Sequence, residues 1–227
     1  MATKQHIDSG ILKKLIDIGR ALSREKNINI LLERILIEAR KISHSDGGTL
    51  YLMTDDDRLS FEILHTESKS LFFGGSHVNV PDTFYPVKLY IDGKPNMNSV
   101  SAVCALEGRT INIKNAYTDK NYDFSGPKGF DKKHDYYSKS FLNVPLKNHK
   151  DKVIGVLQLL NAQKDGEIIS FSEELVDLVE ALTSQASVAL TNQLLVDEQK
   201  QLFRSFIKLV AEALEKKDAV TGGHCNR

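Results

Sequence analysis

One uninterrupted segment constrains the fold most: from Glu167 to Thr221 the chain contains neither glycine nor proline. Proline removes a backbone donor and glycine costs backbone entropy, so a stretch without either residue can form one very long helix. All five prolines lie between positions 81 and 145. This distribution predicts a helical N-terminal part, a mixed centre and a long C-terminal helix.

Apolar side chains repeat every seven residues along the C-terminal segment. A repeat of this kind predicts a coiled-coil seam, which its polar members Gln193 and Lys200 weaken in the middle. For residues 173–192, a helix lying on one face of a sheet is an equal alternative, whereas beyond residue 195 the pattern favours self-association. The two interleaved series are Leu175, Leu182, Ala189, Val196, Phe203 and Val210, and Val179, Ala186, Gln193, Lys200, Ile207 and Leu214.

Two further helices are expected at the N-terminus. Apolar residues from Ile11 to Leu22 follow a 4-3-4 spacing, which places them on one helix face. A short polar break at 26–27 separates them from a second apolar pattern over 28–42, which Gly47 and Gly48 follow as a stop signal. We expect the first helix to join the same bundle as the C-terminal helix.

The centre of the chain changes to the period of β-strands. A hairpin is predicted over residues 49–64, with its turn in the acidic run Asp55–Asp57. Residues 70–98 predict a long loop with a short strand near 87–91, then a short helix over 98–106 and a strand over 110–113. Strands over 140–146 and 153–160 predict a second hairpin. The last strand is almost continuously apolar, so it should be central in the sheet.

Composition excludes several classes of partner. The chain has 30 basic and 30 acidic residues, whereas nucleic-acid and polybasic membrane-surface binders need a net positive field. No apolar run approaches the ~18–20 residues of a membrane span, and the N-terminus has no apolar signal core. Cys104 and Cys225 form no CxxC pair, and a reducing cytoplasm is the simplest compartment. We expect neither a nucleic-acid nor a membrane partner.

The order of these elements, together with two segments, resembles a GAF domain. Residues 108–117 look like the GAF segment in which a glycine leads into a strand and an Asp-x-Tyr-like corner, and residues 141–161 are similar to the closing hairpin. The resemblance implies an α+β fold with a central antiparallel sheet, packed helices, and long terminal helices that form a dimer bundle. It divides the chain into an N-terminal helix (1–27), a GAF sensor domain (28–198) and a connector (199–227).

The closing hairpin is most similar to GAF domains of cyclic-nucleotide-regulated phosphodiesterases. Their scattered Asn-Lys-Phe-Asp-Glu signature is matched by Asn161, Phe171 and Glu174. The lysine position holds Ala162 or Gln163 instead, and the acidic position holds Glu173. In that family the signature braces a pocket more than it contacts the ligand, so the departures at these positions do not exclude a pocket here.

Residues 210–227 resemble the opening of an HD-GYP phosphohydrolase domain, in which a helix leads into Thr-x-Gly-His-x-x-Arg. The resemblance implies a sensor and connector whose catalytic domain is absent. We therefore expect this sequence to be a truncated form of a longer enzyme. The complete enzyme would be a metal-dependent phosphohydrolase acting on cyclic di-GMP, and His224 could be an outer ligand of its divalent metal ions. Within this chain we expect no catalytic residue, no metal and no cofactor.

Matching by position to the GAF pocket implies a set of ligand-binding residues. Free backbone N–H groups at the opening of the short helix near 98–102 suit a phosphate or carboxylate. The next loop would line the pocket, and two aromatic rings would stack on a base. The implied set is Ser99, Ser101, Asn115, Tyr117, Asp119, Tyr122, Phe124 and Ser138.

Two functions remain open from the sequence. The first is a regulatory small-ligand-sensing and dimerisation module, a homodimer through its terminal helices that binds a cyclic nucleotide or another small molecule. The second is a purely structural dimerisation domain, with Tyr122 and Phe124 packing a lid over a filled cavity. Lysines and aspartates interleave over residues 117–139, which favours a solvated lid there over a nucleic-acid surface.

Overall fold

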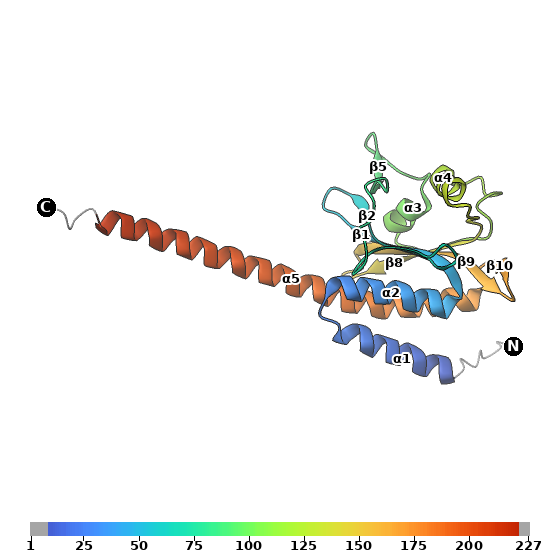
Figure 1. Cartoon of the computed structure of the whole chain (residues 1–227), viewed down its shortest axis with the longest axis horizontal. Helices are drawn as coiled ribbons and strands as arrows, with labels where there is room; N and C mark the ends of the chain where they lie inside the picture. Colours follow the sequence, from blue (N-terminus) through green and yellow to red (C-terminus); the bar gives the residue numbers. More distant parts are fainter. Residues whose placement is uncertain (1–8, 223–227) are drawn as a thin grey trace. The chain divides into compact units, whose positions relative to one another are not determined.

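The computed structural model describes residues 9–222, with side chains described for residues 10–212. Within residues 9–222, five α-helices and ten strands follow one another (Figure 1). Their bounds are α1 Ser9–Arg24, α2 Ile28–Ser43, β1 Ser45–Met53, β2 Arg58–Thr66, a 3-10 turn Glu67–Lys69, β3 Leu71–Gly74, β4 Val87–Lys88, β5 Tyr90–Ile91, β6 Lys94–Pro95, α3 Val100–Glu107, β7 Ile111–Ile113, α4 Ser125–His134, β8 Phe141–Lys147, β9 Val153–Lys164, β10 Glu167–Ile169 and α5 Glu173–Gly222.

The centre of the fold is an antiparallel sheet in the order β3-β2-β1-β9-β8-β7. Strand β9 lies between β1 and β8, which confirms that the almost continuously apolar strand is central. The first seven residues of β1 are all buried, because both faces of the sheet are covered. These pairings confirm the predicted α+β class and both predicted hairpins.

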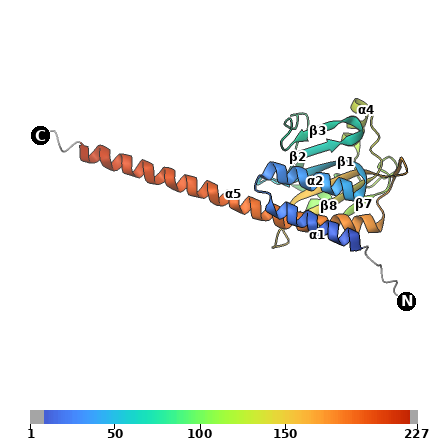
Figure 2. The same cartoon turned by 60° about the horizontal axis from the view of Figure 1, so that its bottom comes forward.

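Helices cover the two faces of the sheet differently. Helix α2 and the first part of α5 lie against one face, whereas α3 and α4 lie over the other (Figure 1). Helix α2 buries Leu32, Ile35 and Leu36 completely or almost completely. Helix α1 lies beside α2 and the start of α5 in both views, and its Gly19 is close to Gln185 (Figure 2).

Helix α5 begins in the domain and continues into a second compact unit, which starts at residue 191. Val179, Leu182 and Ala186 in its first part are buried, as expected for a helix packed within the domain. Along residues 195–210 the apolar side chains are exposed instead, including Phe203 at 64% and Phe206 at 61%. The predicted homodimer along this helix stays a prediction.

Residues 117–139, which we expected to form a solvated lid, contain the helix α4. The sequence signal was weak because Gly126, Pro127 and Gly129 fall within a helix of ten residues. Proline is tolerated in the first turn of a helix, where its missing N–H would have no intrahelical partner. Tertiary hydrogen bonds to the buried carboxylate of Asp131 then hold the helix in place.

Both ends of the short pocket helix are capped. The Ser99 hydroxyl accepts a hydrogen bond from the N–H of Ala102 at 3.4 Å at the start of α3. Gly108 ends the helix at a φ of 59°, in the left-handed region that glycine adopts readily.

Among the described helices, none is long and apolar enough to cross a membrane. His224 lies outside the described residues.

Candidate functional site

A cavity of about 520 Å³ lies between the sheet and the elements over it. Strands β1, β2 and β9 form its floor, α3 and α4 form walls, and residues 83–87 of the long loop complete it. This volume lies within the roughly 300–1,000 Å³ typical of small-molecule sites. Its lining combines aromatic rings with a few hydroxyl, amide and charged groups, which is the usual composition of such sites.

The floor carries a hydrogen-bonded amide pair. Gln158 on β9 is directly opposite Asn143 on β8, and its Nε2 donates to Asn143 Oδ1 at 2.9 Å. The same Nε2 donates to the hydroxyl of Ser101 at 3.1 Å, and that hydroxyl donates to Asn143 Oδ1 at 3.1 Å. The network joins α3 to the centre of the sheet and fixes the orientation of Gln158 at the cavity.

Tyr51 closes the other end of this network. Its hydroxyl donates to Gln158 Oε1 at 3.4 Å, and the side chain lies against Phe61 with ring centroids 4.7 Å apart. Burial raises the pKa of Tyr51 to about 12, so the phenol stays neutral and can donate. The floor is therefore uncharged but polar.

Aromatic rings follow one side of the cavity from β2 to α4. The centroid of Phe84 lies 5.5 Å from that of Phe61 and 6.3 Å from that of Phe130. The ring of His134, one turn along α4, lies 4.3 Å from Phe130. Such a wall suits a flat ring, because aromatic pairs gain about 0.5–1.5 kcal/mol beyond the burial of their area.

Two glycines keep the α4 wall thin. Gly126, Gly129, Phe130 and Lys133 line the cavity at positions i, i+3, i+4 and i+7, which is one face of the helix. A Cβ atom added at either glycine would meet nothing within 4 Å. The space above the glycines is therefore open to a ligand that approaches the backbone of α4.

A buried carboxylate connects the α4 wall to the start of β8. Asp131 accepts hydrogen bonds from the N–H of Ser138 at 2.9 Å and from its hydroxyl at 2.6 Å. The hydroxyl of Tyr117 donates to the same carboxylate at 2.5 Å, and burial together with this hydrogen bond raises the pKa of Tyr117 to about 12. These bonds hold Ser138 at the cavity.

Asn161 braces the same segment from β9. Its Oδ1 accepts from the N–H groups of Lys139 at 2.8 Å and Ser140 at 3.2 Å. Its Nδ2 donates to the carbonyl of Tyr137 at 2.7 Å and to the hydroxyl of Tyr136 at 3.0 Å. The side chain is almost completely buried and uses its full hydrogen-bonding capacity. This arrangement agrees with the bracing role that the signature implied for this residue.

The structure brings together half of the predicted ligand-binding residues. Ser99, Ser101, Phe124 and Ser138 all line the cavity. Their roles as ligand contacts stay predictions.

The other four residues do not line this cavity, and their roles as ligand contacts also stay predictions. Asn115 and Asp119 line a separate open depression beside the end of β7. The Tyr117 hydroxyl donates a hydrogen bond to Asp131, and the Tyr117 ring stacks on that of Tyr137 with centroids 4.4 Å apart. Tyr122 packs at the edge of Phe124, with centroids 6.5 Å apart.

Sequence reasoning missed the residues that give this cavity its chemistry. Gln158 could have been found, since it interrupts an otherwise apolar central strand. Phe84 and Lys133 carried no local signal, because one lies in the irregular loop and the other on the unpredicted helix α4.

The described residues give little support for a metal site or a nucleophilic cysteine. No group of three His, Cys, Asp or Glu side chains within that part of the chain could hold a metal ion. Cys104 is buried, and this burial raises the pKa of its thiol to about 12, which disfavours the nucleophilic thiolate.

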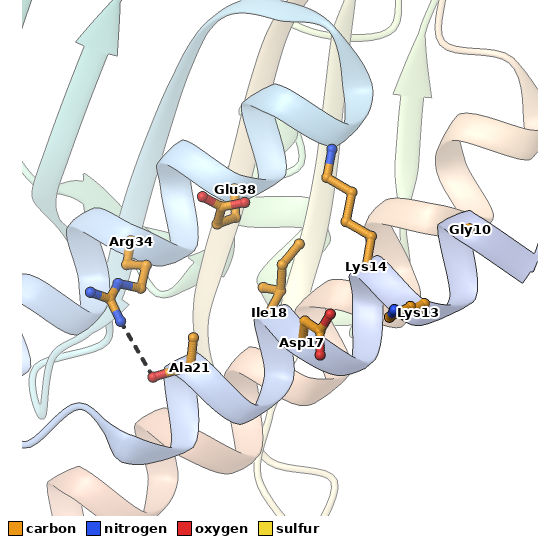
Figure 3. Close-up of a pocket in the computed structure, with 8 residues that line it drawn as sticks. All are labelled: Gly10, Lys13, Lys14, Asp17, Ile18, Ala21, Arg34 and Glu38. Atoms are coloured by element: carbon orange, nitrogen blue, oxygen red, sulfur yellow. Dashed lines mark hydrogen bonds between the residues drawn. The ribbon is translucent and has the colours of Figure 1, made fainter.

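A second depression, of about 710 Å³, lies between α1 and α2 (Figure 3). Its lining mixes Lys13, Lys14 and Arg34 with Asp17 and Glu38, and the Arg34 guanidinium reaches the carbonyl of Ala21 at 3.5 Å. Opposite charges interleave there and no aromatic side chain contributes, so this depression suits a ring-containing ligand less well.

The family profile of the GAF domain matches residues 27–190. The chain belongs to the GAF family. GAF domains are regulatory sensing modules, and the matched region contains the sheet and the cavity. The profile and the first compact unit both end at residue 190. The expected boundary between sensor and connector at residues 198 and 199 stays a prediction.

Curated relatives include cGMP-specific 3′,5′-cyclic phosphodiesterases. The protein from Drosophila mojavensis is 24% identical over 202 residues, which cover 87% of this chain and 17% of the relative. The protein from Drosophila melanogaster is 23% identical over 202 residues and is covered to 16% of its length. The chain thus spans less than a fifth of the length of these relatives.

Solved GAF domains share the fold. The GAF domain of a phosphoenolpyruvate-protein phosphotransferase from Acinetobacter superposes with a TM-score of 0.60 at 17% identity, covering 85% of this chain and 99% of that one. A GAF domain/HD domain protein from Geobacter sulfurreducens gives a TM-score of 0.51 at 12% identity, covering 77% and 98%. At these identities the likeness concerns the fold alone.

Proposed function

We propose that this GAF domain is a regulatory module that binds a cyclic nucleotide in the 520 Å³ cavity and controls a C-terminal metal-dependent phosphohydrolase domain. The observation that carries the proposal is the cavity itself, which combines a polar, uncharged floor with an aromatic wall inside a well-packed domain. The relatives named cGMP-specific phosphodiesterases support the choice of ligand class.

The lining suits the parts of a cyclic nucleotide. The rings of Phe84 and Phe130 offer an apolar wall to a base, and the amide of Gln158 offers hydrogen bonds to its edge. Lys133 lines the cavity and has no carboxylate within 4.0 Å among the described side chains. Its ammonium group is therefore available to a phosphate.

The signal would leave the domain through α5. This helix contains the end of the domain and continues through the heptad pattern of the second unit. In a homodimer, two packings of this helix that differ by a few kcal/mol could be shifted by ligand binding. Gln193 and Lys200 interrupt the apolar seam, so we propose that the change between the two packings takes place around these residues.

The output domain is inferred from the resemblance of residues 210–227 to the start of an HD-type phosphohydrolase. The Geobacter sulfurreducens neighbour, described as a GAF domain/HD domain protein, supports this combination. Divalent metal ions would belong to that domain, not to this chain, and its substrate would be a cyclic nucleotide such as cyclic di-GMP. We propose a cytoplasmic location for the complete protein.

Calorimetry and thermal unfolding with cyclic AMP, cyclic GMP and cyclic di-GMP test the proposal. A ligand at about 100 times its dissociation constant should stabilise the domain by about 2.7 kcal/mol. If none of the three binds or stabilises the protein, the sensing function is wrong.

The exposed apolar side chains of residues 195–210 favour a second candidate, a purely structural dimerisation domain. A dimer in sedimentation equilibrium combined with no response to any of the three nucleotides would support that candidate. A nucleotide that binds with 1:1 stoichiometry per chain would exclude it.

A further inference from the structure

The amide network in the cavity floor contains one unpaired group. Asn143 is completely buried, and its Oδ1 accepts hydrogen bonds from Gln158 and from Ser101. Its Nδ2 has no hydrogen-bond partner. A buried N–H donor without a partner is unfavourable, whereas a carbonyl oxygen with an unused lone pair is tolerated more easily.

A second arrangement of the same side chains removes this unpaired donor. The amide groups of asparagine and glutamine are nearly symmetric in shape, so turning both by 180° exchanges nitrogen for oxygen without moving other atoms. Asn143 Nδ2 would then donate to Ser101 and to Gln158 Oε1, and the unpaired atom would be the Asn143 oxygen. Gln158 Nε2 would point toward the hydroxyl of Tyr51, which can accept.

The two arrangements differ in which atom of Gln158 lies beside Tyr51, a residue that also lines the cavity. With the first, its carbonyl oxygen is on the side of Tyr51, and with the second its N–H groups are there. Gln158 lines the cavity and is half-buried although β9 is an interior strand of the sheet. Thr49, directly opposite Gln158 on β1, also lines the cavity, so a polar row faces the ligand.

We propose that Gln158 is the specificity-determining residue of the cavity and that it reads the edge of a ring in two ways, by turning its amide together with that of Asn143. This inference rests on the proposed cyclic-nucleotide function. In one orientation Gln158 accepts a hydrogen bond from an amino group of the ligand, and in the other it donates to a ring carbonyl. The cavity then admits 6-amino and 6-oxo purine cyclic nucleotides alike.

Calorimetry with cyclic AMP and cyclic IMP tests this inference, because these probes differ at the 6-position and the adjoining N1. The wild-type protein should bind both, with dissociation constants within about tenfold of each other. Gln158→Met keeps the length but removes both polar atoms, and should weaken both probes by about tenfold. Gln158→Glu can only accept when ionised, and should shift the ratio toward cyclic AMP by about tenfold, which corresponds to about 1.4 kcal/mol.

Gln163→Glu provides the matched control, since it makes the same chemical change at an exposed position of β9 outside the cavity. It should leave both affinities unchanged. Thermal unfolding of each variant shows whether it is folded.

Different results separate this inference from the function on which it rests. One outcome is that the wild-type protein binds both probes while Gln158→Met and Gln158→Glu leave the affinities and their ratio unchanged. In that case Gln158 does not determine the specificity of the cavity, whereas the sensing function stands. A wild-type preference above about 100-fold for one probe overturns the two-way reading. If neither probe binds and cyclic GMP and cyclic di-GMP also fail to bind, the sensing function and this inference are both overturned.

Discussion

Asp131 on α4 accepts two hydrogen bonds from Ser138, one from its main-chain N–H at 2.9 Å and one from its hydroxyl at 2.6 Å. Asp131 is 5% exposed and Ser138 is 2% exposed, so water does not replace these bonds. The pair joins the helix that forms one wall of the cavity to the segment that leads into β8. The position of α4 therefore depends on this contact.

Asp131→Asn should lower the free energy of unfolding by about 1–3 kcal/mol, because an amide cannot accept all three hydrogen bonds that reach this carboxylate. Urea denaturation monitored by circular dichroism measures the change. Asp135→Asn is the matched control, since Asp135 ends the same helix, its side chain is fully exposed and its only ion pair is at 3.9 Å. Equal losses in the two variants would contradict the role of Asp131.

Asn161→Ala should be among the most destabilising changes in the domain, at about 2–4 kcal/mol. It removes four hydrogen bonds to residues 136–140 and places alanine at a φ of 56°. Asn161→Gly loses the same bonds but tolerates this φ, so it should be more stable than the alanine variant by about 1 kcal/mol. Chemical denaturation of both variants tests the two contributions separately. If the glycine variant is as stable as the wild type, the bracing role is wrong.

Gly129→Leu should stabilise α4 and weaken ligand binding at the same time. Leucine has a higher helix propensity than glycine by about 0.8–1 kcal/mol, and nothing within 4 Å opposes a Cβ at this position. The side chain would occupy the cavity, so we expect at least a tenfold loss of cyclic-nucleotide affinity in calorimetry. Lys132→Leu, on the same helix but outside the cavity lining, should leave the affinity unchanged. Unchanged binding by Gly129→Leu would place the ligand elsewhere.

Stability should fall as the pH decreases below about 6.5, in part because of His65. Burial, and after it the charge of Arg40, lowers the pKa of His65, whose Nδ1 lies 2.5 Å from Arg40 Nη1. Between the lowered pKa and the ordinary value of about 6.5, the unfolded chain binds more protons than the folded protein. The free energy of unfolding therefore decreases as the pH falls through this window and levels off below the folded pKa.

His65→Gln should make this pH dependence shallower between pH 8 and 5.5, since glutamine can still accept from Arg40 but does not titrate. Urea unfolding at several pH values measures the slope. His149→Gln, in an exposed turn, should leave the slope unchanged. An identical slope in the wild type and His65→Gln would exclude His65 as its source.

Replacing Gln193 and Lys200 together by leucine should strengthen the proposed dimer and lock the connector. Both residues interrupt the apolar seam, and Lys200 now pairs with Asp197 at 2.9 Å. Sedimentation equilibrium should show a dissociation constant lower by at least tenfold, and the full-length enzyme should lose its response to the stimulus. Leucines at Glu198 and Ser205, on the opposite side of the helix, are the control. A full-length enzyme that responds unchanged after the Gln193 and Lys200 substitutions would contradict this signalling route.

Much of the fold followed from local patterns. The absence of glycine and proline over 167–221 predicted α5, the apolar run over 153–160 predicted the central strand, and the pattern over 98–106 predicted α3. Each signal acts among neighbours in the chain, where propensity and periodicity apply directly. Ser99 and Ser101 were expected at the cavity from the positional match to the GAF pocket, and both line it.

The sequence by itself thus determined the family, the order of most elements and the long C-terminal helix. Only the tertiary structure decided that residues 125–134 form a helix, that Tyr117 contacts Asp131 instead of the cavity, and that Gln158 and Phe84 line it. These outcomes depend on contacts between residues well separated in the chain, such as Tyr117 with Asp131 and Ser101 with Asn143 between α3 and β8. Such contacts leave no periodic pattern, because each is one hydrogen bond made once, in a place that the packed sheet provides.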